Sequence, residues 1–521
     1  MSKMSVPEKL AAVELGLKPR MQIVGQTPPD MDIMQRMQHY HIPSVSVAFI
    51  EEGVIHAKTY NLSPTDSVTT NTLFQAGSIS KPVAAVVALK LVEMGILNLD
   101  QNVNDVLTRW KLPASEFTTT EPVTLRKLLS HTAGLNMHGF EGYSSETETL
   151  PTLPQILSGE TPANSGAVRS KKTPGEECIY SGGGTTIVQL LIEDAVKKYK
   201  EQHLGFVGVV GNSFQELAKE LVFDPLEMHQ STYQIIRPGD AHDGAIAKAH
   251  NPVGQVIPGG WHLYPESTAA GLWTTPSDLM RFVLGVQTNR VLSEETSRVM
   301  LTRQMNSDFG LGFALDPTGV QFSHSGVNEG FQNLMAGFSN AQQGVAIMVN
   351  SDNGLKLIEE MTPTLAKVFQ YPDGHQFKSD IRTVAEIDPA IFQNYIGDFE
   401  IRLERGELLH FTLSIEHGQL FVSAPYPGPK DQPRKFELYP QSDTEFFSLS
   451  GQFNLGVAED GSHVRVFGQK AQRIAEYRSQ AEPVSQATLM ANIGLNAARK
   501  PSDLPVVSES RDPVVTLGNG Q

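Results

Sequence analysis

The feature that most constrains this chain is the run VAAVVALKLVEMG at residues 83–95. Its residues favour helices and are apolar on nearly every side, and a helix of that kind is buried. Pro82 suits a first helical turn, and Gly95 suits the C-terminal cap. The sequence therefore predicts a helix buried in the core, with Ser78 at its amino end.

Ser78 and Lys81 form an S-x-x-K motif at the start of this run. On a helix the two side chains lie one turn apart on one face, so the amine can reach the hydroxyl. A serine needs a base to act as a nucleophile, and a lysine withdrawn from water can supply one. The bare motif is more often a solvated pair. The apolar run favours catalysis here, because a lysine at the foot of a buried helix is unusual.

Two further motifs carry groups used in acid–base chemistry. Residues 180–182 (YSG) begin with Tyr180 and lead into glycines that let backbone approach a ligand. The phenol could exchange a proton with a nearby lysine. Residues 324–326 (HSG) end a predicted strand, and His324 could donate to a carbonyl or carboxylate. In isolation, these motifs are more typical of a buried tyrosine on a turn and a surface histidine.

The order of strands and helices indicates an α+β fold. Strand patterns occur before and after a helical middle, so strands from both ends should pair in one antiparallel sheet with helices on its faces. The predicted strands lie at residues 44–49, 54–60, 310–315, 320–324, 332–338 and 345–350. Helices are predicted at residues 125–130, 185–199, 213–222, 277–286 and 354–369, with an insertion at 200–212.

From about residue 388 the pattern changes to short alternating strands without helix signals. Phe411, Leu413 and Ile415 alternate with polar residues, and Asp460–Gly461 is a hairpin signal. Such a stretch predicts a small all-β barrel. We expect four regions: a loosely packed lead-in at 1–30, a main domain at 31–375, the barrel domain at 385–480 and a tail at 481–521.

Charge and cysteine content limit the partners. Lys and Arg number 41 against 57 Asp and Glu, a net charge of −16, so nucleic acid is not expected as a partner. Cys178 is the single cysteine, which excludes an internal disulfide, and we expect it to be buried. Residues 1–20 lack the apolar core of a secretory signal, and no stretch is apolar enough for a membrane span. We therefore expect a cytoplasmic protein.

The three motifs occur together, and with them the chain resembles a family of serine hydrolases. The family comprises class C β-lactamases, D-alanyl-D-alanine carboxypeptidases, D-aminopeptidases and family VIII esterases. Similar segments lie at residues 42–50, 72–83, 123–135, 174–184, 267–282 and 324–331, so the resemblance spans residues 40 to about 355. It implies a β-lactamase/transpeptidase-like fold, and the C-terminal barrel resembles the lipocalin-like domain often appended to such hydrolases.

The resemblance implies roles for the catalytic residues. Ser78 would be the nucleophile that forms an acyl-enzyme. Lys81 and Tyr180 would exchange its proton, and which of them takes it first is left open. The backbone N–H groups of Ser78 and Val327 would form the oxyanion hole.

The resemblance also implies where substrate binds. The third motif, His324, Ser325 and Gly326, would line the substrate together with Val327. Gly182 replaces the asparagine that is usual in the family's Tyr-x-Asn motif, so it lacks a side-chain donor. This departure puts efficient β-lactam or peptide recognition in doubt, while ester or small amide hydrolysis stays plausible.

The implied activity is that of a serine hydrolase that needs no metal or organic cofactor. Its substrate would be a small ester, a D-aminoacyl amide or peptide, or a β-lactam. The alternative is an inactive or weak penicillin-binding or assembly protein on the same scaffold, against which the retention of Ser78, Lys81 and Tyr180 argues. The natural substrate, a homo-oligomeric state and the role of the barrel are left open.

Overall fold

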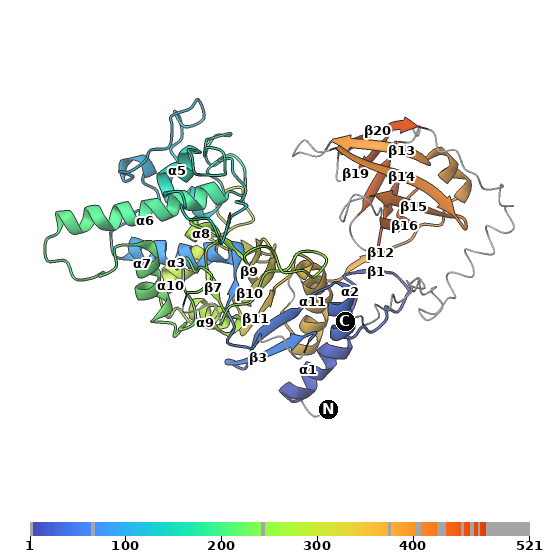
Figure 1. Cartoon of the computed structure of the whole chain (residues 1–521), viewed down its shortest axis with the longest axis horizontal. Helices are drawn as coiled ribbons and strands as arrows, with labels where there is room; N and C mark the ends of the chain where they lie inside the picture. The colour runs from blue at the N-terminus through green and yellow to red at the C-terminus, as the bar shows by residue number, and fades with distance from the viewer. Residues whose placement is uncertain are drawn as a thin grey trace, which may run out of the picture. The chain divides into compact units, whose positions relative to one another are not determined.

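The computed structural model describes residues 4–63, 68–240, 245–372, 377–402, 408–424, 434–449, 453–458, 463–466 and 469–475. The chain forms two compact units (Figure 1). Unit 1 comprises Met1–Arg20 and Asp30–Ser379, and unit 2 comprises Met21–Pro29 and Asp380–Gln521. The predicted tail at 481–521 and the predicted turn at Asp460–Gly461 lie outside the described residues.

Unit 1 is built on an antiparallel sheet that, among the described residues, has six strands in the order β3-β2-β11-β10-β9-β8. Two strands come from the start of the unit and four from its end, so the predicted pairing of strands from both ends is confirmed. The strands are β2 (Ser44–Glu51), β3 (Val54–Asn61), β8 (Ala314–Leu315), β9 (Gln321–Asn328), β10 (Phe331–Phe338) and β11 (Ala341–Val349).

Helices cover both faces of this sheet, as an α+β fold requires (Figure 1). One face packs against α1 (Val6–Leu15) and α11 (Gly354–Phe369), and the other against α9 (Pro276–Gln287). Successive residues of β2 alternate between the two cores: Val47 belongs to one and Ala48 to the other. The alternation follows from the period of two along a strand. In the described part of the expected loose lead-in at 1–30, α1 instead packs against the sheet and buries Val13 in the core.

The predicted buried helix is α3 (Ser80–Glu93), preceded by a short 3₁₀ turn, η1 (Gly77–Ile79). Its valines, alanines and leucines are almost all buried, and each buried Val or Leu contributes about 1.5–3 kcal/mol. This burial offsets the cost of enclosing Lys81, which is only 4% exposed. After the helix, Gly95 adopts a left-handed φ of 72°, and Ile96 N–H bonds to the Leu91 carbonyl, which closes the helix end.

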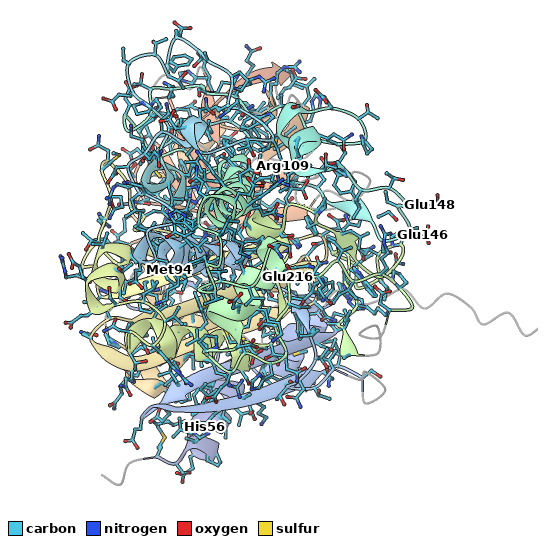
Figure 2. All side chains as sticks on the ribbon, turned by 90° about the vertical axis from the view of Figure 1, so that its left-hand side faces the viewer. His56, Met94, Arg109, Glu146, Glu148 and Glu216 are labelled. Carbon is cyan, nitrogen blue, oxygen red and sulfur yellow. The ribbon has the colours of Figure 1, made fainter. Side chains whose placement is uncertain are left out.

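Of the remaining helices, α2 packs into the core that contains α1 and α11, and the others lie on the same side of the sheet as α3. The longest is α6 (Gly182–Gln202), and the others are α2 (Ile33–His39), α4 (Leu125–Leu129), α5 (Leu153–Ser158), α7 (Phe214–Ala218), α8 (Ser267–Ala270) and α10 (Glu294–Met300). Arg109, labelled in Figure 2, pairs with Glu193 and with the buried Asp194 of α6. After α6, the predicted insertion carries Leu204 and Val207 as exposed side chains. Across the described residues, every helix is too short or too polar to cross a membrane.

Unit 2 contains a closed antiparallel barrel, β13 to β20, which confirms the predicted barrel. Its strands, as described, are β13 (Gly397–Arg402), β14 (Leu408–Glu416), β15 (Gln419–Ala424), β16 (Arg434–Pro440), β17 (Glu445–Phe447), β18 (Asn454–Val457), β19 (Val464–Val466) and β20 (Gln469–Ala475). Apolar side chains fill the interior, among them the stacked pair Phe399 and Phe411.

An N-terminal strand completes unit 2. Strand β1 (Met21–Ile23) pairs in parallel with β12 (Asp380–Arg382). Met21 and Ile23 pack against Phe447 of the barrel. The first residues of the chain therefore contribute to both units.

Candidate active site

Ser78 and Lys81 meet at the foot of α3. The Lys81 Nζ donates a 2.9 Å hydrogen bond to Ser78 Oγ and a 2.8 Å bond to the carbonyl of Ala269 in α8. The second bond anchors the amine to a different helix. The one-turn spacing therefore produces the predicted contact between amine and hydroxyl.

Tyr180 lies beside the lysine, just before α6. The Lys81 Nζ stands 5.0 Å from the centre of the Tyr180 ring. Ser181 caps α6, because its Oγ accepts from Gly184 N–H and donates to the Asn136 carbonyl. The structure thus brings Tyr180 beside Lys81, which lies about 100 positions earlier in the sequence.

His324 projects from β9 toward the same site. Its ring centre lies 6.0 Å from that of Tyr180, and the side chain is buried. Burial, aided by the charge of Lys81, lowers the pKa of His324 to about 3, so the ring is neutral. Nδ1 lies 2.6 Å from the Ser325 carbonyl, which can only accept, so Nδ1 carries the proton. Nε2 finds no hydrogen-bond partner among the described residues.

The third motif brings β9 against the turn that carries Ser78. Gly77 has a φ of 55°, and the backbone nitrogen of Val327 lies 2.6 Å from the position of a Cβ on Gly77. Gly326 is buried, whereas Ser325 and Val327 are exposed along the strand edge. The Val327 amide therefore lies beside the turn that carries Ser78, where the oxyanion hole is predicted.

A buried amide network, which the sequence patterns do not predict, fixes this approach. Asn333 of β10 donates to the Gln75 carbonyl at 2.9 Å. Asn328 of β9 donates to Gln75 Oε1 at 2.9 Å and to the Ala270 carbonyl at 3.1 Å. These bonds tie the segment before Ser78 to β9, β10 and α8. An asparagine within a strand pattern can indicate a buried hydrogen bond. The sequence does not reveal which residue accepts that bond, because the fold determines the partner.

Gly182 begins α6 in a confined place. Its N–H donates to the His138 carbonyl at 3.0 Å. A Cβ at this position would lie 3.0 Å from that carbonyl oxygen and 3.3 Å from the Phe140 ring. The segment 138–140 therefore occupies the space into which an asparagine side chain would project.

Two histidines beside Tyr180 were not predicted as site residues. The ring of His131 lies 4.3 Å from the Tyr180 ring, and that of His138 lies 4.8 Å away. Both belong to segments near the predicted helix at 125–130, where no local pattern reveals the contact. Cys178 is exposed rather than buried as expected, and Ser307 Oγ donates to its sulfur.

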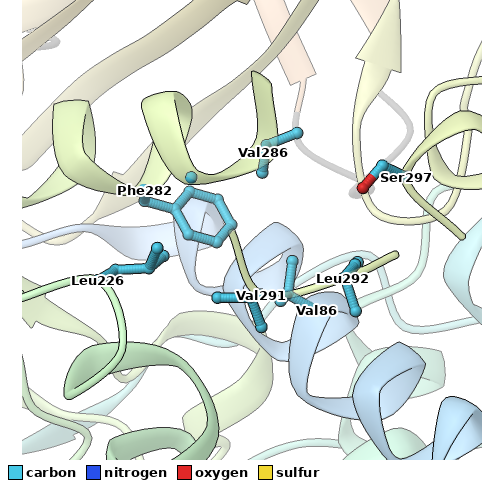
Figure 3. Close-up of a pocket in the computed structure, with 8 residues that line it drawn as sticks. Val86, Leu226, Phe282, Val286, Val291, Leu292 and Ser297 are labelled. Carbon is cyan, nitrogen blue, oxygen red and sulfur yellow. The ribbon is translucent and has the colours of Figure 1, made fainter. Parts of the chain in front are cut away.

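A small hollow in unit 1 lies away from these motifs. Figure 3 shows it between α3, α9 and α10, and its volume is about 10 Å³. Its lining is apolar except for Ser297: Val86, Leu226, Phe282, Gly285, Val286, Val291 and Leu292. It contains none of the motif residues, so we do not include it in the candidate site.

An antiparallel sheet beside a serine–lysine pair at the foot of a buried helix is the architecture of a class of serine hydrolases. The family model described as Beta-lactamase matches residues 31–368, and the chain belongs to this family. The chain is thus a serine hydrolase, and the alternative of an inactive assembly scaffold is not favoured.

Curated relatives and solved structures agree with this assignment. Penicillin-binding protein 4* of Bacillus subtilis (strain 168) is 24% identical over 75% of this chain and 87% of its own length. Penicillin-binding protein 4 of Amycolatopsis lactamdurans is 24% identical over 57% of this chain and 77% of its own.

Among solved structures, the octameric penicillin-binding protein homologue from Pyrococcus abyssi matches with a TM-score of 0.54 and 20% identity. It covers 84% of this chain and 97% of its own. The D-amino acid amidase from Ochrobactrum anthropi SV3 complexed with L-phenylalanine matches with a TM-score of 0.51 and 19% identity, over 65% of this chain and 96% of its own. At these identities the structures show the shared fold.

Proposed function

We propose that Ser78 is the nucleophile of an acyl-transfer reaction on a small ester or amide. The observation that carries this proposal is the 2.9 Å contact between Lys81 Nζ and Ser78 Oγ. An amine that contacts a hydroxyl at the buried start of a helix can accept the hydroxyl proton. A serine must lose this proton to become nucleophilic. Tyr180, beside the same amine, supplies the second group for proton exchange.

The reaction proceeds in two halves. Ser78 Oγ forms a bond to the substrate carbonyl carbon and gives its proton to the Lys81–Tyr180 pair. The carbonyl oxygen becomes an oxyanion and is held by the N–H groups of Ser78 and Val327. When the tetrahedral intermediate collapses, the bond to the leaving group breaks, and the pair returns the proton to that group. Water then attacks the acyl-enzyme by the same steps and releases the acid.

The substrate class follows from Gly182 and the segment beside it. The position offers no amide donor, and the segment 138–140 fills the adjoining space. Substrates that depend on an amide contact there, such as β-lactams with acylamino side chains, gain nothing from this position. Small esters and D-aminoacyl amides do not need it and are the proposed substrates.

Covalent labelling tests the nucleophile. A fluorophosphonate probe should label the intact protein once, and Ser78→Ala should abolish labelling while the circular dichroism spectrum stays unchanged. Ser339→Ala, which removes an exposed hydroxyl from the turn between β10 and β11, is the matched control and should label normally. Full labelling of Ser78→Ala would refute the assignment.

Turnover tests the substrate class. We expect hydrolysis of p-nitrophenyl esters and a D-aminoacyl anilide, and slow turnover of a chromogenic cephalosporin. Lys81→Ala should reduce kcat/KM for the ester by at least about 100-fold, the usual contribution of a proton-transfer group. A cephalosporin turned over faster than every ester would contradict the proposed preference.

A further inference from the structure

His131 is the residue in closest ring contact with Tyr180, and neither the motifs nor the proposed mechanism uses it. The two rings lie 4.3 Å apart at 35°, and the edge of Phe309 packs against His131 at 4.8 Å. The side chain is buried, with 3% exposed. A buried polar ring is stable only when its nitrogens have hydrogen-bond partners, so the partners of His131 indicate its role.

The hydrogen bonds of His131 reach the chain on both sides of Tyr180. Its carbonyl oxygen accepts from Ile179 N–H at 2.8 Å. Its ring Nδ1 accepts from Ser181 N–H at 3.2 Å. One residue therefore holds the backbone N–H groups of both neighbours of Tyr180, and its ring packs on the phenol itself.

These bonds define the protonation state of the ring. Because Nδ1 accepts from an N–H group, it carries no proton, and the proton of the neutral ring is on Nε2. Burial, followed by the charge of Lys81, lowers the pKa of His131 well below its usual range. His131 therefore keeps Nδ1 as a hydrogen-bond acceptor and adds no second positive charge beside Lys81.

The backbone at His131 supports a role beyond packing. His131 follows the end of α4 with a left-handed φ of 58°, and Thr132 N–H bonds to the Lys127 carbonyl. This position after a helix is normally filled by glycine or asparagine, since a Cβ is unfavourable there. Strain of this kind is often retained at functional sites.

We propose that His131 is the positioning residue of Tyr180, holding the phenol toward Lys81 through its carbonyl, its Nδ1 and its ring. This inference rests on the proposed function, in which Tyr180 exchanges protons at Ser78. His131 itself does not touch the reacting atoms; it acts through Tyr180. A hydrogen-bond acceptor in this position is what the role requires.

Two substitutions that both tolerate a left-handed backbone test the role. His131→Gly removes ring and acceptor, and His131→Asn keeps an acceptor near the position of Nδ1. We expect kcat for a p-nitrophenyl ester to fall about 100-fold in His131→Gly with little change in KM, as for a displaced catalytic group. His131→Asn should stay within about tenfold of the wild type. If His131→Gly does not fold, His131→Leu takes its place.

Further measurements separate positioning from stability. Leu190→Ala in the core of α6 should lower Tm but leave kcat per folded molecule unchanged. The titratable groups that face Tyr180 are Lys81, His131, His138 and His324. Because His131→Gly removes one of them and releases the phenol, it should also alter the pH profile of kcat/KM. Equal kcat in His131→Gly and His131→Asn overturns the inference. So does a His131→Gly variant that, like Leu190→Ala, has a lowered Tm and an unchanged kcat per folded molecule. An inactive wild type that also resists the fluorophosphonate overturns the proposed function instead.

Discussion

A Cβ atom on Gly326 would lie 1.8 Å from the carbonyl oxygen of Ala76. No side chain fits in that space, so strand β9 can rest against the turn that carries Ser78 only because residue 326 is glycine. The same approach places the amide of Val327 beside Gly77. The glycine of the third motif thus sets the distance between Ser78 and the strand edge along which we expect substrate to bind.

Gly326→Ala should separate β9 from the Ser78 turn. We expect a loss of about 1–3 kcal/mol in the free energy of unfolding, typical of overpacking. The labelling rate by fluorophosphonate should fall about 100-fold, because the oxyanion donors move apart. Gly166→Ala, where a new Cβ meets only Met137 at 3.9 Å, is the matched control and should keep wild-type labelling. Unchanged labelling of Gly326→Ala would show that this contact is dispensable.

Gly182→Asn restores the family's asparagine but should not restore its function. The new Cβ meets the His138 carbonyl oxygen and the Phe140 ring, so the segment 138–140 must shift and the Gly182–His138 hydrogen bond must weaken. We expect destabilisation of about 1–3 kcal/mol by chemical denaturation and no gain in cephalosporin turnover. A stable variant that hydrolyses the cephalosporin faster than wild type would contradict this account.

Glu266 makes stability depend on pH. The carboxyl group is fully buried, neither oxygen has a hydrogen-bond partner among the described residues, and burial raises its pKa from 4.5 to about 8. Between these values the folded form holds a proton that the unfolded chain releases, so rising pH favours unfolding. We expect the free energy of unfolding of the wild type, relative to Glu266→Gln, to fall by about 1.4 kcal/mol per pH unit.

Denaturation at pH 6, 7 and 8 isolates this effect. Burial also raises the pKa of Asp352, to about 6, so its contribution is largely complete at the start of this window. Glu266→Gln keeps the shape and cannot ionise, and its curve should lack the Glu266 slope. Parallel curves for the two proteins would mean that Glu266 is ionised in the folded state.

Ile23→Asp tests the N-terminal strand of unit 2. Ile23 is 8% exposed and packs with Phe447, so an aspartate there should destabilise unit 2 by about 2–4 kcal/mol. Val24→Asp, at a position that is 57% exposed, is the adjacent control and should be neutral. Calorimetry should show an early transition in Ile23→Asp, while Ser78 still reacts with the probe. A single unshifted transition would argue against the contribution of β1.

The core of unit 1 and the contact between Ser78 and Lys81 could be predicted because their signals are local. An apolar run fixes the burial of α3, and one helical turn sets the spacing of Ser78 and Lys81. The sequence pattern predicts that α6 starts at residue 185, whereas the helix begins at Gly182. Its three glycines disfavour a helix, but carbonyl groups of the segment 137–138 and the Ser181 cap satisfy their N–H groups.

Contacts that depend on distant segments could not be predicted. The packing of His131 on Tyr180 requires the left-handed turn after α4, which the sequence does not announce because histidine is unusual there. The pairing of β1 with β12 joins residues more than 350 positions apart through a very short strand. In both cases tertiary structure outweighs local preference.

The chain crosses between its units after Arg20, after Pro29 and after Ser379. A protease nick at the last of these points would therefore leave the barrel fragment docked on a strand that remains covalently part of the other fragment. A barrel transplanted onto another protein should carry residues 21–29 with it. During synthesis, that strand emerges from the ribosome long before its partner, and it must wait for nearly the whole polypeptide before it can pair.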